Sequence, residues 1–201
     1  MSQTSTTISG QPISRPVSST RLLHPAAAVL LGSAFVALCA HISIPLVFTP
    51  VPLTLQNFAV LVIGLLLEPA AAFAALVLYL IEGASGLPVF APSVPGGLLH
   101  LFGPSGGYLL AYPFIAAIAG ILARRSRPAT FTTLALSATA ASLALYIAGA
   151  SWFQILTHAS PAATLKMTVL PFLAGDALKV VAAAAIATAW MNFRKKTDTT
   201  I

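Results

Sequence analysis

The stretch PFLAGDALKVVAAAAIATAWMNFRKK, residues 171–196, decides the fold of this chain. After Lys179 it holds no charged residue until the basic cluster at residues 194–196. A bilayer core about 30 Å thick requires roughly 20 consecutive apolar residues in helical form. The segment from about Met167 to Phe193 meets that length, so we predict a transmembrane helix that ends at a basic cluster.

The composition of the whole chain also indicates a membrane protein. Of its 201 residues, 58% are hydrophobic and only 7% are charged, whereas soluble domains carry about 25% charged residues. A surface in contact with lipid removes the need for polar groups that a soluble fold of this size would have. The net charge is +6, but the basic residues stand between apolar runs, so we expect them to set topology and expect no nucleic-acid partner.

Five further apolar segments precede this helix. Glu68-Pro69 is the only break between the second and the third, which are both short. A single long helix over residues 56–81 is the alternative, and Pro69 argues against it because proline breaks or kinks a helix interior. We therefore expect transmembrane helices over residues 25–44, 56–67, 70–82, 105–123, 129–149 and 167–193.

The basic residues favour six spans over five. With six spans, eight basic residues before the first, after the fourth and after the sixth helix lie on one side, against Lys166 on the other. The positive-inside rule makes the first side cytoplasmic. If the second and third helices were a single span, the arginines of residues 124–127 would lie on the opposite side of the membrane from the N-terminal tail. We predict an all-α integral membrane protein of six transmembrane helices with both the N- and C-termini cytoplasmic.

This pattern divides the chain into three regions. Residues 1–24 are rich in Ser and Thr and contain no acidic residue, so we expect a disordered cytoplasmic tail, with an organellar transit peptide as the alternative. Residues 25–193 form the six-helix membrane domain. Residues 194–201 form a basic cytoplasmic tail.

The predicted outer connections are long, and the inner ones are short. The outer connections cover residues 45–55, 83–104 and 150–166, and the first two are rich in proline or in proline and glycine. Binding residues are concentrated on loops that a rigid scaffold positions. We therefore expect recognition to occur at the outer face.

Asp176 and Lys179 are the clearest candidates for a binding site. They lie three residues apart in the sixth apolar segment and so share one helix face. Ionisable groups at membrane depth are costly and normally face a cavity or a partner. Counted from Met167, Asp176 lies roughly 13 Å along the helix, in the outer half of the bilayer. We interpret the two residues as an anchor for a polar ligand, with a structural ion pair as the alternative.

Other polar and aromatic residues lie toward the outer ends of the predicted helices. Glu82 is the last residue of the third predicted helix, where its side chain either contacts a ligand or is solvated at the helix end. Gln56 opens the second helix, where its amide caps that helix or meets a ligand. Tyr79, Tyr108 and Tyr146 fit either a binding site or an interfacial aromatic belt.

The sequence contains no catalytic constellation. It lacks the phosphate-binding loop GxxxxGK followed by Ser or Thr, and its four histidines have no metal-ligand spacing. Cys39 is the single cysteine, so the chain forms no internal disulfide. We expect a protein that is not an enzyme and holds no metal or cofactor. If transport here uses ATP, another subunit must hydrolyse it.

Four segments, in this order, resemble the BioY family, the biotin-specific S-components of energy-coupling factor (ECF) importers. The resemblance covers about residues 25–193. The segments are IPLVFTPVPLTLQN (44–57), LYLIEGASGLPVFAPSVPGGLLHLFGPSGGYLLAY (78–112), LYIAGASWF (145–153) and PFLAGDALK (171–179).

The resemblance implies the ECF S-component fold and a biotin-binding subunit that mediates biotin uptake across the cytoplasmic membrane. Biotin would bind near the external face beneath the first outer loop, and partner subunits would hydrolyse ATP. An S-component for another vitamin and a stand-alone secondary biotin transporter are the alternatives. In the family the sixth-helix Asp and Lys line the biotin pocket, which implies that role for Asp176 and Lys179. Together with residues chosen from their positions, the predicted ligand-binding set comprises Gln56, Tyr79, Glu82, Gly96, Gly97, Tyr108, Tyr146, Asp176 and Lys179.

The resemblance also implies roles for individual residues. Lys179 would neutralise the biotin carboxylate while Asp176 accepts ureido N–H bonds, or Asp176 would only orient Lys179. In the family, an Ala-x-x-x-Ala face of the first helix contacts the energy-coupling transmembrane subunit. The nearest pattern here is Ser33-x-x-x-Ala37, and ordinary packing of small residues between helices is the alternative.

Overall fold

The computed structural model describes residues 20–92, 96–126 and 128–199. Helices dominate it, and one two-stranded pairing joins the ends of the first outer loop. The elements are α1 (Thr20–His41), β1 (Ser43–Ile44), β2 (Leu53–Thr54), α2 (Gln56–Leu66), α3 (Pro69–Ala84), α4 (Leu98–Leu101), α5 (Gly106–Arg125), α6 (Phe131–Thr157), α7 (Pro161–Thr168) and α8 (Leu173–Thr199).

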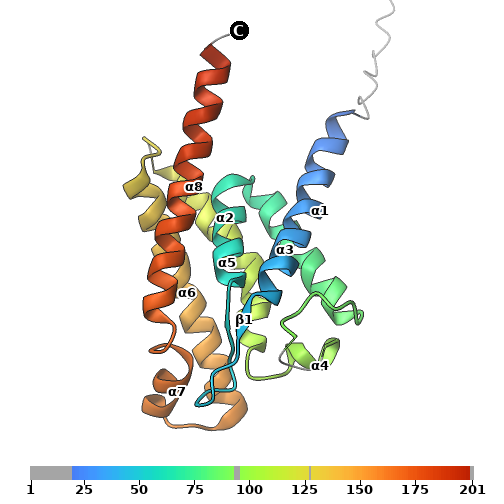
Figure 1. Ribbon diagram of the computed structural model, residues 1–201, viewed down its shortest axis with the longest axis vertical. Helices are drawn as coiled ribbons and strands as arrows, with labels where there is room; N and C mark the ends of the chain where they lie inside the picture. The colour runs from blue at the N-terminus through green and yellow to red at the C-terminus, as the bar shows by residue number, and fades with distance from the viewer. Residues whose placement is uncertain (1–19, 93–95, 127, 200–201) are drawn as a thin grey trace, which may run out of the picture.

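The longer helices α1, α2, α3, α5, α6 and α8 run back and forth between the two ends of the molecule. Figure 1 shows the start of α1 and the end of α8 at one end, and β1, α4 and α7 at the opposite end. Six alternating passages return the chain to the end from which it started. This arrangement is compatible with the prediction of six spans and of both termini on one side.

Among the residues that the structure describes, three helices are long and apolar enough to cross a membrane: α5, α6 and the part of α8 up to Arg194. The outward faces of α6 and α8 are apolar, with Ile147 and Leu178 each 70% exposed. Contiguous apolar surface of this kind is typical of contact with lipid. The chain is accordingly a multi-pass membrane protein.

The helix α2 is short because it lies in the interior of the bundle. It has 11 residues, nine of them buried, and at about 1.5 Å per residue it is roughly 16 Å long. It packs against α1, α5 and α8. A helix that is surrounded by other helices does not have to match the thickness of the bilayer.

Small residues allow this close packing. A Cβ added to Gly64 of α2 would lie 2.6 Å from the carbonyl oxygen of Ala116 in α5, and one added to Gly32 of α1 would lie 3.0 Å from Ala75 of α3. Small residues at such contacts let helix backbones approach closely in membrane proteins.

The turn between α2 and α3 confirms the prediction of two helices rather than one. Pro69 begins α3 at its first position, where its missing N–H is not required. The guanidinium of Arg124 donates to the carbonyl oxygen of Leu67 at 2.7 Å and to that of Gly120 at 3.1 Å. It also pairs with Glu68 at 3.3 Å, so α5 fixes the turn.

The outer end of the bundle differs from the prediction. The helix α6 continues to Thr157 rather than ending at Gly149, because the chain turns only at His158, the one described non-glycine residue with a positive φ. The expected loop over residues 150–166 therefore contains the last turns of α6 and most of α7. Ser160 caps α7 by accepting from the N–H of Ala163.

The ends of the membrane domain also need correction. The helix α1 begins at Thr20 rather than at Pro25, and α8 begins at Leu173 rather than at Met167. Asp176 therefore lies in the first turn of α8, nearer the outer end than its predicted depth of roughly 13 Å. Because α8 runs to Thr199, residues 194–199 are helical, and their assignment to a basic cytoplasmic tail stays a prediction. The rest of the predicted N-terminal tail, residues 1–19, lies outside the described residues.

The topology is tested by cysteine labelling in a Cys39→Ala background. Arg125 and Lys166 are both exposed and lie at opposite ends of the bundle. We expect a membrane-impermeant maleimide added to intact cells to label Lys166→Cys and to spare Arg125→Cys until the membrane is permeabilised. Labelling of Arg125→Cys in intact cells would exclude the predicted orientation.

Candidate ligand-binding site

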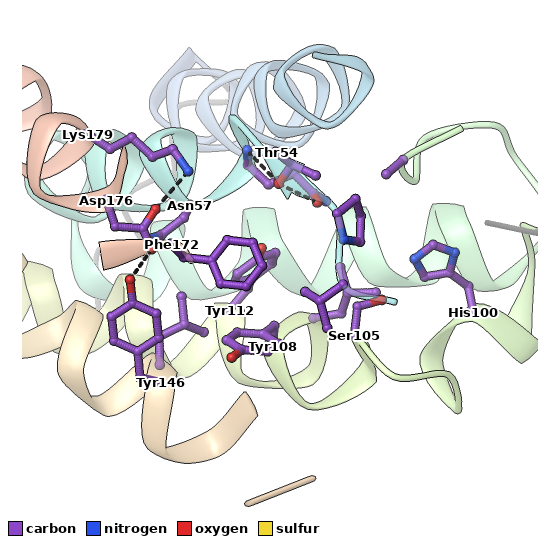
Figure 2. Close-up of a pocket in the computed structure, with 16 residues that line it drawn as sticks. Thr54, Asn57, His100, Ser105, Tyr108, Tyr112, Tyr146, Phe172, Asp176 and Lys179 are labelled. Carbon is purple, nitrogen blue, oxygen red and sulfur yellow. Dashed lines mark hydrogen bonds and ion pairs between the residues drawn. The ribbon is translucent and has the colours of Figure 1, made fainter. Parts of the chain in front are cut away.

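A cavity opens at the outer end of the bundle, between the first outer loop, α2, α4, α5, α6 and α8 (Figure 2). Its empty volume, which includes open space at its mouth, is about 560 Å³. Nine of the sixteen lining residues are aromatic or aliphatic, and the other seven are polar or charged. The lining residues are Val51, Pro52, Thr54, Gln56, Asn57, Ala91, His100, Ser105, Tyr108, Leu109, Tyr112, Leu145, Tyr146, Phe172, Asp176 and Lys179.

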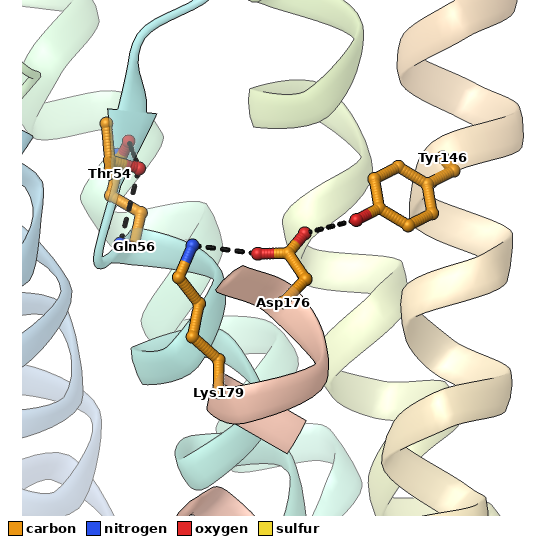
Figure 3. A network of polar contacts seen from close by, with 5 residues as sticks. All are labelled: Thr54, Gln56, Tyr146, Asp176 and Lys179. Atoms are coloured by element: carbon orange, nitrogen blue, oxygen red, sulfur yellow. Dashed lines mark hydrogen bonds and ion pairs between the residues drawn. The ribbon is translucent and has the colours of Figure 1, made fainter. Parts of the chain in front are cut away.

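The most polar part of the wall is a buried network around Asp176 (Figure 3). The Lys179 Nζ atom lies 2.7 Å from Asp176 Oδ1, and the two side chains are only 11% and 10% exposed, respectively. The Tyr146 hydroxyl donates to Asp176 Oδ2 at 2.6 Å. Each carboxylate oxygen therefore has a partner before any ligand binds. Three of the predicted site residues come together here, from α6 and α8.

The first outer loop covers this site. Its two ends pair as antiparallel strands, with Ser43 opposite Thr54. Between them, the Thr49 hydroxyl donates at 2.8 Å to the carbonyl oxygen of Met167 in α7 and accepts from the N–H of Val51. Val51 and Pro52 then line the cavity. The loop is thus joined to α7 by a hydrogen bond and forms one wall of the site.

Gln56 lines the cavity, and Tyr79 supports it from behind. The Gln56 amide donates to the Tyr79 hydroxyl at 2.5 Å and accepts from the Thr54 hydroxyl at 3.3 Å. Tyr79 is fully buried, donates in turn to the carbonyl oxygen of Val89, and is absent from the cavity wall. In this structure Tyr79 positions Gln56, and its predicted contact with the ligand stays a prediction.

Tyr108 lines the cavity and is fixed by α6 and α7. Its hydroxyl donates to the carbonyl oxygen of Thr168 at 2.5 Å. Its ring occupies the space that a Cβ on Gly149 would take. In the same way, Trp152 fills the space above Gly107 and donates to the carbonyl oxygen of Gly103 at 3.0 Å. Two of the quoted segments, residues 78–112 and 145–153, thus meet through aromatic side chains that pack on glycines.

Three further residues predicted to contact the ligand, Glu82, Gly96 and Gly97, lie away from the cavity wall. Glu82 accepts a hydrogen bond from Ser33 at 2.5 Å on the side where α1 packs against α3. Ser33 is fully buried and Ala37 is half-buried, and the partner contacts at both residues stay predictions. Gly96 and Gly97 precede α4, and the φ of +81° at Gly97 lets the chain turn into that helix.

The structure adds cavity residues that the sequence analysis did not select. They include Asn57, His100, Ser105, Tyr112 and Phe172. Asn57 follows Gln56 at the start of an otherwise apolar helix, and this position was a usable signal. His100 is 3% exposed and packs against Phe90, with the ring centroids 4.8 Å apart. It reaches the cavity only because α4 folds within a glycine-rich loop. Within the part of the chain that the structure describes, no three His, Cys, Asp or Glu residues form a metal site.

The buried ion pair is tested by single and double substitution. Lys179→Met leaves Asp176 charged and buried, so we expect the ligand-free protein to lose about 3 kcal/mol of stability. Asp176→Asn combined with Lys179→Met removes both charges together, and we expect it to recover most of that loss. Thermal unfolding in one detergent measures both effects. Equal loss in the single and double variants would show that the two residues do not act as a pair.

The comparisons with known proteins agree with this architecture. The profile of the family described as the BioY family matches residues 9–196. A protein of Pyrococcus horikoshii named "Probable biotin transporter BioY" is 39% identical over 79% of this chain and 93% of its own length. The "Biotin transporter BioY" of Thermotoga maritima is 36% identical over 77% and 88%, respectively.

A solved structure has the same fold. It is the S-component for biotin from an ECF-type ABC transporter, and it superimposes with a TM-score of 0.79 at 23% identity, covering 88% of this chain and 95% of that one. The predicted S-component fold is therefore confirmed. The family profile matches almost the whole length of this chain, and a relative is 39% identical over most of the chain. This chain therefore belongs to the BioY family.

Proposed function

We propose that this chain is the biotin-binding S-component of an importer in the cytoplasmic membrane. The observation that carries the proposal is a small-molecule cavity at the outer end of an S-component fold, in a chain whose relatives are named biotin transporters. The protein binds its ligand and forms part of the route across the membrane. Biotin is the cargo, and no cofactor takes part.

The chemistry of the cavity fits biotin. Biotin combines a polar ureido ring with an apolar thiolane ring and a valeryl chain that ends in a carboxylate. Tyr108, Tyr112 and Phe172 offer apolar surface to the rings and the chain (Figure 2). Lys179 offers a charge-assisted donor, and such bonds contribute roughly 1.5–3 kcal/mol each. Two or three of them together with burial of the hydrocarbon support nanomolar binding, about −12 kcal/mol.

Energy for uptake comes from other subunits in this proposal. The sequence has no ATP-binding loop of the GxxxxGK type. An energy-coupling transmembrane subunit and ATPase subunits would supply it, with the α1 surface around Ala37 as the predicted contact. Ala37 lines an open groove with Ala34 and Leu38, and small side chains there allow a partner helix to approach closely.

The binding function is tested by isothermal titration of the purified protein with biotin and with a panel of other vitamins. We expect biotin alone to bind, and Lys179→Ala to weaken binding by about 2 to 4 kcal/mol, roughly 30- to 1,000-fold. Asp176→Asn should cost less, because the amide keeps an acceptor and the shape of the side chain.

The stability of each ligand-free variant in the same detergent serves as the control. A folded Lys179→Ala protein with the affinity of the wild type would exclude the lysine as a ligand contact. Binding of a different vitamin would change the assigned cargo. Uptake in cells that lack the energising subunits would favour a stand-alone transporter.

The loop over residues 45–55 should respond to the ligand. Val51, Pro52 and Thr54 line the cavity, so a bound ligand adds contacts that oppose local opening of the loop. We expect hydrogen exchange in this segment to slow when biotin is added. Exchange at the inner turn around Pro69 should not change and serves as the reference. An unchanged rate in the loop would show that biotin does not bind beneath it.

A further inference from the structure

Asn57 is a buried amide without a partner. Both its Oδ1 and its Nδ2 atoms are inaccessible to solvent and make no hydrogen bond in the ligand-free protein, and the residue as a whole is 6% exposed. Leaving a buried donor and a buried acceptor unpaired is costly. Because Asn57 lines the cavity, a bound molecule is the partner that would satisfy both atoms.

The neighbouring amide shows the contrast. Gln56 also lines the cavity, but its side chain is already bonded to Tyr79 and Thr54 within the protein. Gln56 is therefore a structural element of the wall. Of the two amides at the start of α2, Asn57 is the one with its hydrogen-bonding capacity unused.

The position of Asn57 shows which other groups its partner meets. Asn57 lies in the first turn of α2 and Asp176 in the first turn of α8. The two helices pack against each other, and both start at the outer end of the bundle (Figure 1). Figure 2 shows Asn57 at the same end of the cavity as Tyr146, Asp176 and Lys179, while Ser105 and His100 lie at the other end.

A primary carboxamide carries a donor and an acceptor side by side. The edge of a cyclic urea, which has an N–H beside its carbonyl group, is the complementary surface. A carboxylate offers acceptors only and would leave the Asn57 oxygen unpaired. The chemistry of Asn57 therefore matches the ring of the proposed ligand rather than its acidic end.

We propose that Asn57 reads the urea edge of the ligand, with Oδ1 accepting a ring N–H and Nδ2 donating to the ring carbonyl oxygen. The ring then lies at the first turns of α2 and α8, beside Asp176 and Lys179, so the Lys179 ammonium faces the ring rather than the carboxylate, and the acid-bearing chain points toward Ser105 and His100. This inference rests on the proposed biotin-binding function and adds the orientation of the ligand and a residue that determines specificity.

Asn57→Leu tests the inference through two measurements of opposite sign. Leucine has nearly the shape of asparagine and no polar atoms, so the ligand-free protein should melt at the same temperature or higher once the unpaired amide is gone. Biotin affinity should fall by about 10- to 100-fold, as expected for two lost hydrogen bonds. Ser142→Ala is the matched control, because Ser142 Oγ is another buried, unpaired group and lies outside the cavity wall. Its removal should leave affinity unchanged.

Ligand analogues test the orientation. Biotinamide keeps the urea and loses the carboxylate charge, so Asn57→Leu should weaken biotinamide and biotin by the same factor. Iminobiotin near neutral pH carries a guanidinium, which only donates, in place of the urea. The carboxylate of Asn57→Asp only accepts hydrogen bonds, so this variant should shift the binding preference from biotin toward iminobiotin by at least about tenfold. This second variant keeps the test decisive if the leucine variant folds poorly.

The outcomes separate this inference from the proposed function. Wild-type protein that does not bind biotin would end the proposed function itself. If the wild type binds biotin and Asn57→Leu binds it equally well, the function stands and the role of Asn57 is wrong. If Asn57→Leu weakens biotin and leaves biotinamide unaffected, Asn57 contacts the carboxylate and the proposed orientation is reversed.

Discussion

The need to keep the Asp176–Lys179 pair away from lipid organises the outer half of this protein. Hydrocarbon offers no hydrogen-bonding groups, so charges at this depth must be enclosed by protein. The pair lies in the first two turns of α8, where α2 and α6 pack on that helix. Tyr146 bonds to the carboxylate, and the first outer loop covers the site. The enclosure is a cavity with a polar end, which is also what binding of a small polar molecule requires.

Close packing of small residues makes that enclosure possible. Gly64 lets the short helix α2 approach α5 in the centre of the bundle, and Gly149 makes room for the ring of Tyr108. As a result, the two amides at the start of α2 lie at the cavity. The glycines of the family segments thus serve packing, and the polar side chains beside them serve recognition.

Much of this arrangement was predictable from sequence, and the physical reasons for the exceptions are local. Pro69 located the inner turn because proline cannot continue a helix, and the charges at positions 176 and 179 stood out in an apolar run. The start of α8 was misjudged because hydrophobicity does not distinguish α7 from the connection that follows it. Asn57 could have been found as a second amide at the start of an apolar helix, but the cavity position of His100 depends on the four-residue helix α4, which leaves no periodic signal in the sequence. Glu82 was selected for its charge, but its direction depends on the packing of α1 against α3.

The contacts that Arg124 makes at the inner turn between α2 and α3 have a consequence for evolution. Arg124 bonds to the backbone carbonyl groups of Leu67 and Gly120, and any sequence supplies these acceptors. Its pairing with Glu68 involves a carboxylate whose side chain is 78% exposed, where an ion pair contributes little. Position 68 is therefore free to drift, while position 124 is constrained, since the single ammonium of lysine cannot reproduce the fork of a guanidinium. The inner end of the protein can thus diversify its surface charge without disturbing the helix that carries Asn57 at its far end.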